Sequence, residues 1–177
     1  GYWSFWETPL TELAGKVIGL VGFGRIGQRV GELAHAFGLE VWAHAPSSKE
    51  DPGYAPFAFK SVEEIFAGAD IVSLHCPQTP ENTGFVNADL LGSMKGGSLF
   101  INTARGGLVD EQALADALRA GRPRAAATDV ASTEPIAATN PLLAAPNLIM
   151  TPHMAWATVE ARQRLMQMTA DNIAAFQ

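Results

Sequence analysis

The amino-acid sequence predicts a doubly wound α/β fold, in which a parallel β-sheet carries helices on both faces. From residue 16 onward, short hydrophobic runs alternate with segments whose apolar residues have helical spacing. The first run ends in a glycine-rich turn that opens a helix. The chain has 177 residues and is 47% hydrophobic, which suffices for one sizeable core. Strands that alternate with helices in this way are typical of parallel sheets.

Six strands and five helices are expected. The strands span residues 16–21, 40–44, 70–74, 98–102, 125–130 and 148–150, and the helices span 26–37, 61–68, 87–95, 110–120 and 158–176. The first helix is indicated by apolar residues at helical spacing, namely Ile26, Val30, Leu33 and Phe37. Ser61 and Glu64 form the sequence pattern of a capping box at the start of the second helix. Residues 45–60 and 131–147, each with three prolines, are expected to be long loops.

Composition excludes several classes of function. The net charge is -6 and no basic run is present, so we expect neither nucleic acid nor an anionic membrane as a partner. No apolar stretch is long enough to span a bilayer, and the first residues lack the pattern of a signal peptide. The single cysteine, Cys76, excludes an internal disulfide and a multi-cysteine zinc site, and we expect no metal. The expected location is therefore the cytoplasm.

The turn after the first strand has the sequence Gly22-Phe23-Gly24-Arg25-Ile26-Gly27, which is a G-x-G-x-x-G motif. Gly22 allows a tight turn, Gly24 lets the backbone approach a pyrophosphate, and Gly27 lets the helix lie close to the strand. The start of the helix offers unpaired N–H groups and a partial positive charge to phosphates. Between a strand and a helix, this motif favours a dinucleotide site over a purely structural turn.

The second strand ends without the acidic residue that commonly grips the adenosine ribose in such domains. The segment reads His44-Ala45-Pro46-Ser47-Ser48-Lys49. Its two hydroxyls and ammonium group would tolerate the extra phosphate of NADP. They could equally be ordinary loop residues beside a weaker NAD ribose contact. The sequence therefore leaves NAD and NADP open.

Four further polar residues follow the later strands. Arg105 follows the fourth strand, Asp129 ends the fifth, Glu134 lies in the next loop, and His153 follows the sixth. Each alone has an ordinary explanation, as a surface charge, a strand-end cap, a solvated loop residue or a turn residue. Ligands of open α/β sheets bind at the carboxyl ends of the strands, so all four are expected at the edge that holds the glycine motif. Together they supply an anion clamp, an acid–base imidazole and a carboxylate to tune it.

These residues lie in motifs that resemble those of the D-2-hydroxyacid dehydrogenases, most closely their glycerate dehydrogenase (hydroxypyruvate reductase) branch. The motifs run nearly end to end: Val21 to Gln28, His75-Cys76-Pro77 with Thr79, Glu81 and Thr83, Met94 to Gly97, Ile101 to Glu111, Asp129-Val130, Glu134-Pro135, Asn140 to Leu143, Pro146-Asn147 and Thr151-Pro152-His153.

The resemblance implies a role for each matching residue. His153 would exchange a proton with the substrate oxygen, Glu134 would pair with His153, and Arg105 would bind the substrate. Asp129 would face the nicotinamide of NAD or NADP, and Arg25 and Ile26 would meet the pyrophosphate. The remaining candidate cofactor contacts are Gly22, Gly24, Gly27, Ser47, Cys76, Pro77, Thr83, Thr103 and Ala104. Cys76 is expected to be a wall of the cofactor site and not a nucleophile.

The resemblance also implies what this chain lacks. The family's substrate lobe is formed by about a hundred preceding residues and a terminal return segment, so residues 16–177 correspond to the dinucleotide-binding domain alone. We expect the isolated chain to be nearly inactive, whether it is an excised domain or a shortened protein. The expected reaction interconverts a small D-2-hydroxy acid and its 2-oxo acid, of the hydroxypyruvate or glyoxylate type. The alternative is a corepressor-like protein that senses NAD(H) with the same fold.

Residues 1–15 are expected to form a separate arm. Tyr2, Trp3, Phe5 and Trp6 place four aromatic residues at a chain end, where polar residues are usual. The arm could fold back on its own domain. Because the corresponding segment pairs cofactor lobes in the resembling family, and because Trp and Tyr are favoured interface anchors, we expect a homodimer.

Overall fold

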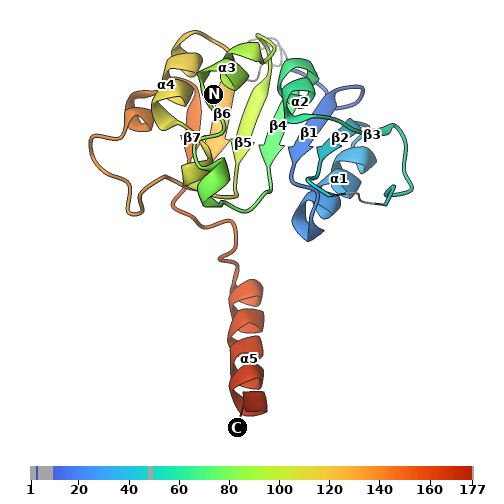
Figure 1. The fold of residues 1–177 in the computed structure, drawn as a ribbon, viewed down its shortest axis with the longest axis vertical. Helices are drawn as coiled ribbons and strands as arrows, with labels where there is room; N and C mark the ends of the chain where they lie inside the picture. Colours follow the sequence, from blue (N-terminus) through green and yellow to red (C-terminus); the bar gives the residue numbers. More distant parts are fainter. Residues whose placement is uncertain (1–2, 4–9, 48–49, 177) are drawn as a thin grey trace.

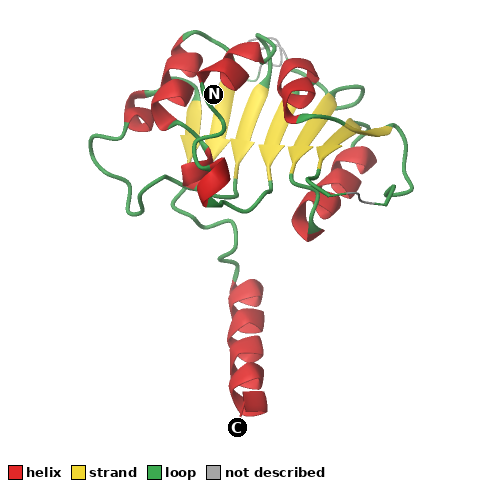
Figure 2. Ribbon diagram, in the orientation of Figure 1, coloured by secondary structure: helices red, strands yellow, loops and turns green. Residues whose placement is uncertain are grey.

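The computed structural model describes residue 3, residues 10–47 and residues 50–176, and it contains a single parallel sheet (Figures 1 and 2). The strands are β1 (Val17–Val21), β2 (Glu40–His44), β3 (Phe57–Phe59), β4 (Ile71–Leu74), β5 (Leu99–Asn102), β6 (Ala125–Thr128) and β7 (Leu148–Met150). Their order in the sheet is β3-β2-β1-β4-β5-β6-β7, and each neighbouring pair is parallel. The chain reverses its direction of progress between β1 and β4, which is the topological switch point of a doubly wound sheet.

Helices lie on both faces of this sheet (Figure 1). The α-helices are α1 (Arg25–Ala36), α2 (Val62–Gly68), α3 (Ala88–Ser93), α4 (Glu111–Arg119) and α5 (Val159–Phe176), and three 3-10 turns are η1 (Pro80–Asn82), η2 (Gly106–Leu108) and η3 (Pro141–Ala144). Helices α2, α3 and α4 pack side by side on one face. On the opposite face, α1 contacts β1 and β2, while Ile149 of β7 is exposed. The predicted fold class is therefore confirmed, and helices cover more of the sheet on the face with α2, α3 and α4 than on the face with α1.

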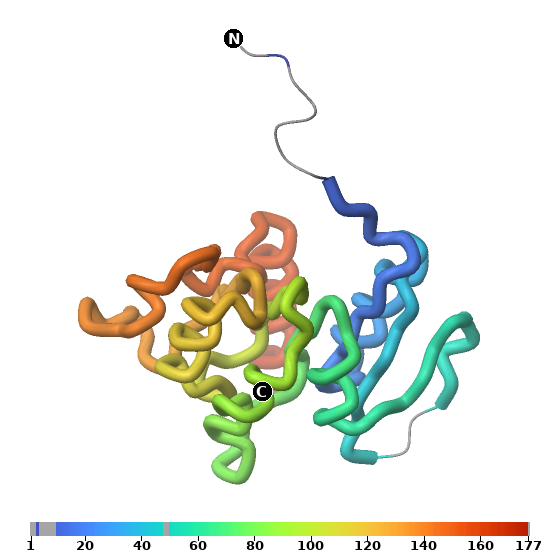
Figure 3. Tube along the Cα trace, turned by 90° about the horizontal axis from the view of Figure 1, so that it is seen from above, coloured from blue at the N-terminus to red at the C-terminus, as the bar shows by residue number. Residues whose placement is uncertain are grey.

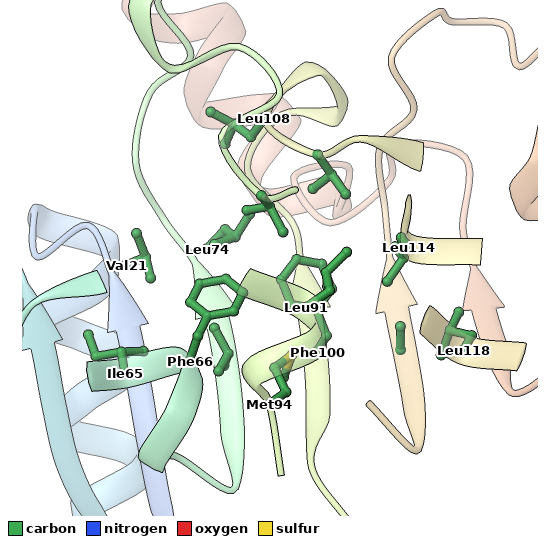
Figure 4. Packing of buried hydrophobic residues seen from close by; sticks show 14 of the residues in the cluster. Val21, Ile65, Phe66, Leu74, Leu91, Met94, Phe100, Leu108, Leu114 and Leu118 are labelled. Atoms are coloured by element: carbon green, nitrogen blue, oxygen red, sulfur yellow. The ribbon is translucent and has the colours of Figure 1, made fainter. Parts of the chain in front are cut away.

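The main core lies between the sheet and α2, α3 and α4 (Figure 4). Phe66 of α2 and Phe100 of β5 are fully buried at its centre, with ring centroids 6.3 Å apart. Leu91 and Leu114 extend this core along α3 and α4. Burying such side chains contributes about 1.5–3 kcal/mol each, so this face is the main source of stability.

The sheet has seven strands, whereas six were predicted from the sequence. The additional strand, β3, lies in residues 45–60, which were predicted to be a loop. It has only three residues and pairs only with β2, so it is too short to show a hydrophobic period. Tertiary contacts hold it in place, because Phe57 and Phe59 pack on Phe23 of the glycine turn.

The segment predicted to be the other long loop, residues 131–147, contains the short turn η3. It lies on the opposite side of the molecule from residues 45–60 (Figure 3). The strand predicted at 125–130 also ends two residues early. The Thr128 hydroxyl donates a hydrogen bond to the Val130 carbonyl oxygen at 2.7 Å and closes a turn there.

Helix α1 forms where it was predicted, but of the four apolar residues that predicted it only Val30 packs against the core beside the sheet. Ile26 is 69% exposed and Phe37 is 66% exposed. The buried residues of α1 are Gly27, Gly31 and Ala34. Small residues face the sheet because the helix lies too close to it for larger ones: a Cβ at position 27 would collide with the carbonyl oxygen of Gly22.

Helix α5 also forms where it was predicted, but none of its residues is buried. It extends away from the sheet, beyond the carboxyl ends of the strands (Figure 1). Among the described residues, no helix combines the length and the apolar character that a membrane span requires. Of the predicted arm, residues 1–2 and 4–9 lie outside the described residues, and Trp3 is almost fully exposed.

Candidate active site

A cavity of about 750 Å³ lies at the carboxyl edge of the sheet. Its walls come from the segments that follow β1, β4, β5, β6 and β7, so it covers the switch point between β1 and β4. Eight of the site residues predicted from sequence line it: Ile26, Cys76, Pro77, Thr103, Ala104, Arg105, Asp129 and His153. Residues that are far apart in the sequence are therefore gathered into one site.

The other predicted residues lie outside the lining of this cavity. These are Gly22, Gly24, Arg25, Gly27, Ser47, Thr83 and Glu134. The glycines and Arg25 belong to the adjoining turn, Ser47 is exposed after β2, and Thr83 accepts a hydrogen bond from the lining residue Gln78 at 3.3 Å. Glu134 lines a neighbouring cavity of about 690 Å³ that shares Asp129 and His153.

Sequence reasoning missed five lining residues: Val30, His75, Gln78, Ala155 and Trp156. Trp156 is the largest of them and is 52% exposed. Its position three residues after His153 was the signal that could have identified it. An indole this close to an acid–base candidate contributes apolar surface to the same cavity.

The glycine turn is shaped by contacts that allow no side chain at two of its three glycines. Gly22 has φ +106°, and a Cβ there would lie 2.5 Å from the Cys76 nitrogen. At Gly27, a Cβ would collide with the Gly22 carbonyl oxygen. At Gly24, the N-cap of α1, a Cβ would meet no protein atom within 4 Å, and no side chain caps the helix. The first N–H groups of α1 thus have no side-chain acceptor at the cap, and Gly24 leaves room beside them, which fits a phosphate group.

The end of β2 offers no carboxylate to this edge. Ala45 is half-buried and packs against the core under α1, and Pro46 and Ser47 are exposed. Ser48 and Lys49, which were proposed as contacts for the extra phosphate of NADP, lie outside the described residues.

Arg105 is the N-cap of η2 and is exposed at the cavity. The Asn102 side-chain amide donates to the Arg105 carbonyl oxygen at 2.9 Å, and the Asn102 Oδ1 accepts from the Ala104 nitrogen at 3.0 Å. One guanidinium nitrogen donates to the Ala104 carbonyl oxygen at 2.6 Å. The buried Asn102 thus fixes the backbone that carries Arg105. The forked guanidinium group of Arg105 is suited to binding a carboxylate.

His153 and Glu134 form a hydrogen-bonded pair at the rim of the cavity. The His153 Nδ1 lies 2.7 Å from the Glu134 Oε2, and the two side chains are 40% and 39% exposed. The hydrogen bond from His153, helped by one from the Ala131 nitrogen, lowers the pKa of Glu134. An ionised carboxylate only accepts hydrogen bonds, so the proton of this bond belongs to Nδ1 and Nε2 is the nitrogen left for proton exchange.

Asp129 holds the backbone that carries His153. It is only 4% exposed, and its carboxylate accepts hydrogen bonds from the Thr151 hydroxyl, the Met154 nitrogen at 2.9 Å and the Ala155 nitrogen at 2.8 Å. Burial opposes its ionisation, but these hydrogen bonds outweigh burial, so its pKa is lowered. The loop needs this support because His153 has a φ of 52°, which L-residues rarely adopt.

Cys76 and His75 do not form a nucleophile–base pair. The His75 Nε2 lies 3.0 Å from the Ser73 hydroxyl, and burial lowers the pKa of the imidazole. Burial likewise raises the pKa of the Cys76 thiol, which disfavours the reactive thiolate. The described residues also include no group of three or more His, Cys, Asp or Glu side chains placed to share a metal ion.

The parallel sheet, the glycine turn and the cavity over the switch point define a dinucleotide-binding domain of the Rossmann type. Residues 1–155 match the family model described as D-isomer specific 2-hydroxyacid dehydrogenase, NAD binding domain. The chain therefore belongs to the D-2-hydroxyacid dehydrogenase family and contains its NAD-binding domain.

Individual relatives agree with this assignment. The chain is 43% identical over 174 residues to a hydroxypyruvate reductase of Blautia hydrogenotrophica, covering 98% of this chain and 54% of that protein. A D-lactate dehydrogenase of Aquifex aeolicus, solved with NAD and lactic acid, superposes with a TM-score of 0.90 at 32% identity, covering 99% of this chain and 57% of the other. An acyclic imino acid reductase solved with NADPH and D-Arg gives a TM-score of 0.84 at 34% identity, covering 94% and 52%. This chain thus spans about half the length of these relatives.

Proposed function

We propose that this chain is the cofactor-binding lobe of an enzyme that interconverts a small D-2-hydroxy acid and its 2-oxo acid, of the hydroxypyruvate or glyoxylate type. One observation carries the proposal. The His153–Glu134 pair and the Arg105 guanidinium meet at a cavity that also adjoins an open helix N-terminus. An acid–base group, an anion-binding group and a phosphate-binding turn are the parts that this reaction requires.

Each polar residue has a role in this reaction. When bound, a nicotinamide cofactor supplies the hydride chemistry. Charge builds on the substrate oxygen during reduction, and His153 donates a proton to it from Nε2. Glu134 stabilises the charged imidazole through Nδ1 and holds the ring in one orientation. Arg105 binds the substrate carboxylate with its remaining N–H groups. Asp129 would face the nicotinamide, and it also holds the loop of His153 through hydrogen bonds from the Met154 and Ala155 nitrogens.

The residues of the turn would hold the cofactor. The N–H groups after Gly24 would bind the pyrophosphate, flanked by Arg25 and Ile26, and Cys76, Pro77, Thr103 and Ala104 would form the opposite wall. Thr83 and Ser47 would lie at the periphery. We propose that NAD and NADP both fit, since no carboxylate at Ala45 repels the extra phosphate of NADP.

The substrate class is supported by the names of relatives. They include the hydroxypyruvate reductase given above, a glyoxylate reductase of Aeropyrum pernix and a glycerate dehydrogenase of Methylorubrum extorquens. A small polar 2-oxo acid suits a site whose reactive groups are Arg105 and His153, because both ends of such a molecule are oxygens.

The activity is tested in a fusion of this chain to the half of the Blautia hydrogenotrophica reductase that it does not match. The fusion should oxidise NADH when hydroxypyruvate or glyoxylate is added, and the chain alone should be nearly inactive. His153→Ala in the fusion should lower the rate by about two orders of magnitude, the usual worth of general acid catalysis, with NADH affinity little changed. Near-normal turnover by this variant would show that His153 is a structural residue.

The same assay separates the enzyme from the corepressor-like alternative. A pure sensor of NAD(H) would bind the dinucleotide but reduce the 2-oxo acid negligibly. The pairing of His153 with Glu134 favours the enzyme, because binding of a dinucleotide alone requires no acid–base pair.

We also propose that the chain forms a homodimer and resides in the cytoplasm. The exposed side chains of Leu33 in α1 and of Phe37 directly after it give a partner surface besides the aromatic residues of the arm. Sedimentation of the intact chain and of a variant lacking residues 1–7 tests the dimer. A monomeric intact chain would refute it, and a truncated chain that remains dimeric would exclude the arm as its cause.

A further inference from the structure

A second carboxylate holds the loop that carries Glu134. Glu111, in the first turn of α4, accepts three hydrogen bonds from residues that lie 21 and 29 positions further along the chain. We propose that Glu111 is a positioning residue that keeps Glu134 against His153. The proposal rests on the proposed function of the His153–Glu134 pair and extends it to a residue outside the cavity.

The contacts of Glu111 are short and use both of its oxygens. Its Oε1 accepts from the Ser132 nitrogen at 2.7 Å. Its Oε2 accepts from the Ser132 hydroxyl at 2.6 Å and from the Asn140 side-chain amide at 2.8 Å. Hydrogen bonds to an ionised carboxylate are roughly twice as strong as neutral ones, so this is a firm attachment for an otherwise exposed loop.

The attachment lies two residues from Glu134. The Ala131 nitrogen donates to the Glu134 Oε1 at 3.1 Å, so residues 131–134 form one turn with Ser132 inside it. On the other side, the Ala131 backbone lies so close to Gly106 that a Cβ at position 106 would collide with it. The turn is therefore held from both sides by the segment from Gly106 to Glu111.

Such support matters because the His153–Glu134 pair is exposed. Exposed ion pairs are weak because holding two long side chains in one geometry costs conformational entropy. In water, whose dielectric constant is high, the attraction between the charges is too small to offset that cost. A turn that is already ordered places the Glu134 carboxylate before the pair forms, and that lowers this cost. Because Arg105 directly precedes Gly106, the same segment also joins the anion-binding group to the acid–base pair.

The titration of Glu134 in the intact 177-residue chain tests the proposal. Nuclear magnetic resonance of isotope-labelled glutamate carboxyls gives its midpoint, and the spectrum of Glu134→Gln identifies its signal. In the native chain the pKa of Glu134 lies below its usual value because of His153, with Ala131 contributing and burial and Asp129 opposing. Glu111→Ala should move the midpoint upward towards that of an ordinary glutamate, since a loosened turn populates the pair less.

Exchanging the acceptor at position 111 with the donor at position 140 gives a second test, which is useful if Glu111→Ala folds poorly. In Asn140→Asp, Oδ1 still caps η3 by accepting from the Leu142 nitrogen, but the other oxygen faces Glu111 and repels it. In the double variant Glu111→Gln with Asn140→Asp, the new amide can donate to the new carboxylate. The single variant Asn140→Asp should raise the Glu134 midpoint, and the double variant should restore it.

Glu63→Gln provides the matched control, because Glu63 is likewise in the first turn of a helix, α2, whose neighbouring loops carry no member of the pair. Its Glu134 midpoint should equal that of the native chain. A native Glu134 midpoint in folded Glu111→Ala or Asn140→Asp, or a double variant that restores nothing, would overturn the proposal. Failure of the fusion enzyme to reduce a 2-oxo acid would instead count against the proposed function, and it leaves the Glu134 titration unaffected.

Discussion

The two sides of the cavity are built in different ways. In the glycine turn at residues 22–27, backbone leaves no room for a side chain at two positions: Gly22 lies against Cys76, and Gly27 lies against Gly22. The acid–base side is held by side-chain hydrogen bonds between distant residues, such as Asp129 with Ala155 and Glu111 with Asn140. The glycines of the first side therefore stand in one short sequence motif, whereas the contacts of the second side join residues that only the fold brings together.

The largest expected effect comes from breaking the first side. In Gly27→Ala, the added methyl group would collide with the Gly22 carbonyl oxygen, which is backbone and cannot move aside. Overpacking of this kind costs about 1–3 kcal/mol, more than the roughly 1 kcal/mol that alanine gains over glycine in a helix. Thermal unfolding should show lower stability, and NADH titration should show no binding.

Two matched alanine variants sharpen that result. Gly24→Ala adds a methyl group that meets no protein atom, so stability should be kept while NADH affinity falls. Gly97→Ala, also in open space but away from the cavity, should change neither. If Gly24→Ala binds NADH as tightly as the native chain, the turn does not face the pyrophosphate.

Breaking the second side at Asp129 should have the next largest effect. Asp129→Asn replaces one acceptor oxygen with a donor, which then faces either the Ala155 N–H group or both the Met154 N–H group and the Thr151 hydroxyl. A buried group left unpaired costs about 1–3 kcal/mol, measurable by denaturant unfolding. Asp89→Asn, on the exposed first turn of α3, is the control and should be near neutral.

The same carboxylate predicts a pH dependence. The folded pKa of Asp129 is lowered, so its contribution to stability is present above the unfolded pKa and is lost as the pH falls through the folded pKa. Unfolding curves of the native chain in acid should show this loss, and those of Asp129→Asn should lack it. Equal acid sensitivity in both proteins would show that Asp129 is not ionised in the fold.

The smallest expected effect concerns the choice between cofactors. Ala45→Asp would place a carboxylate where the adenosine ribose is expected, at the end of β2. The new charge should oppose the extra phosphate of NADPH and leave NADH affinity equal or improved, as measured by parallel titrations. An equal change for both cofactors would mean that the ribose does not reach this position.

The difference between the two sides of the cavity also explains which parts of the fold and of the site could be predicted from the sequence. For six strands the predicted ends lie within two residues of the observed ends. Short hydrophobic runs and the glycines that end them can be recognised from neighbouring residues alone. Strand β3 was missed, since only its packing on Phe23 indicates it. The predicted site residues directly after β4, β5 and β7, which are Cys76-Pro77, Thr103 to Arg105 and His153, line one cavity because parallel strands end at one edge. Glu111 was not predicted to contribute to the site, because nothing in the sequence indicates its contacts with Ser132 and Asn140.

An NMR titration of this chain with NADH, read at the backbone amides, shows directly whether the dinucleotide binds at the carboxyl edge of the sheet. We expect saturable one-to-one binding, with the largest shifts at residues 22–27, 75–77, 103–105 and 153–156, which form the turn and the walls of the cavity. No saturable binding, or shifts confined to α5 and residues 131–147, would contradict the placement of the dinucleotide at this edge of the sheet.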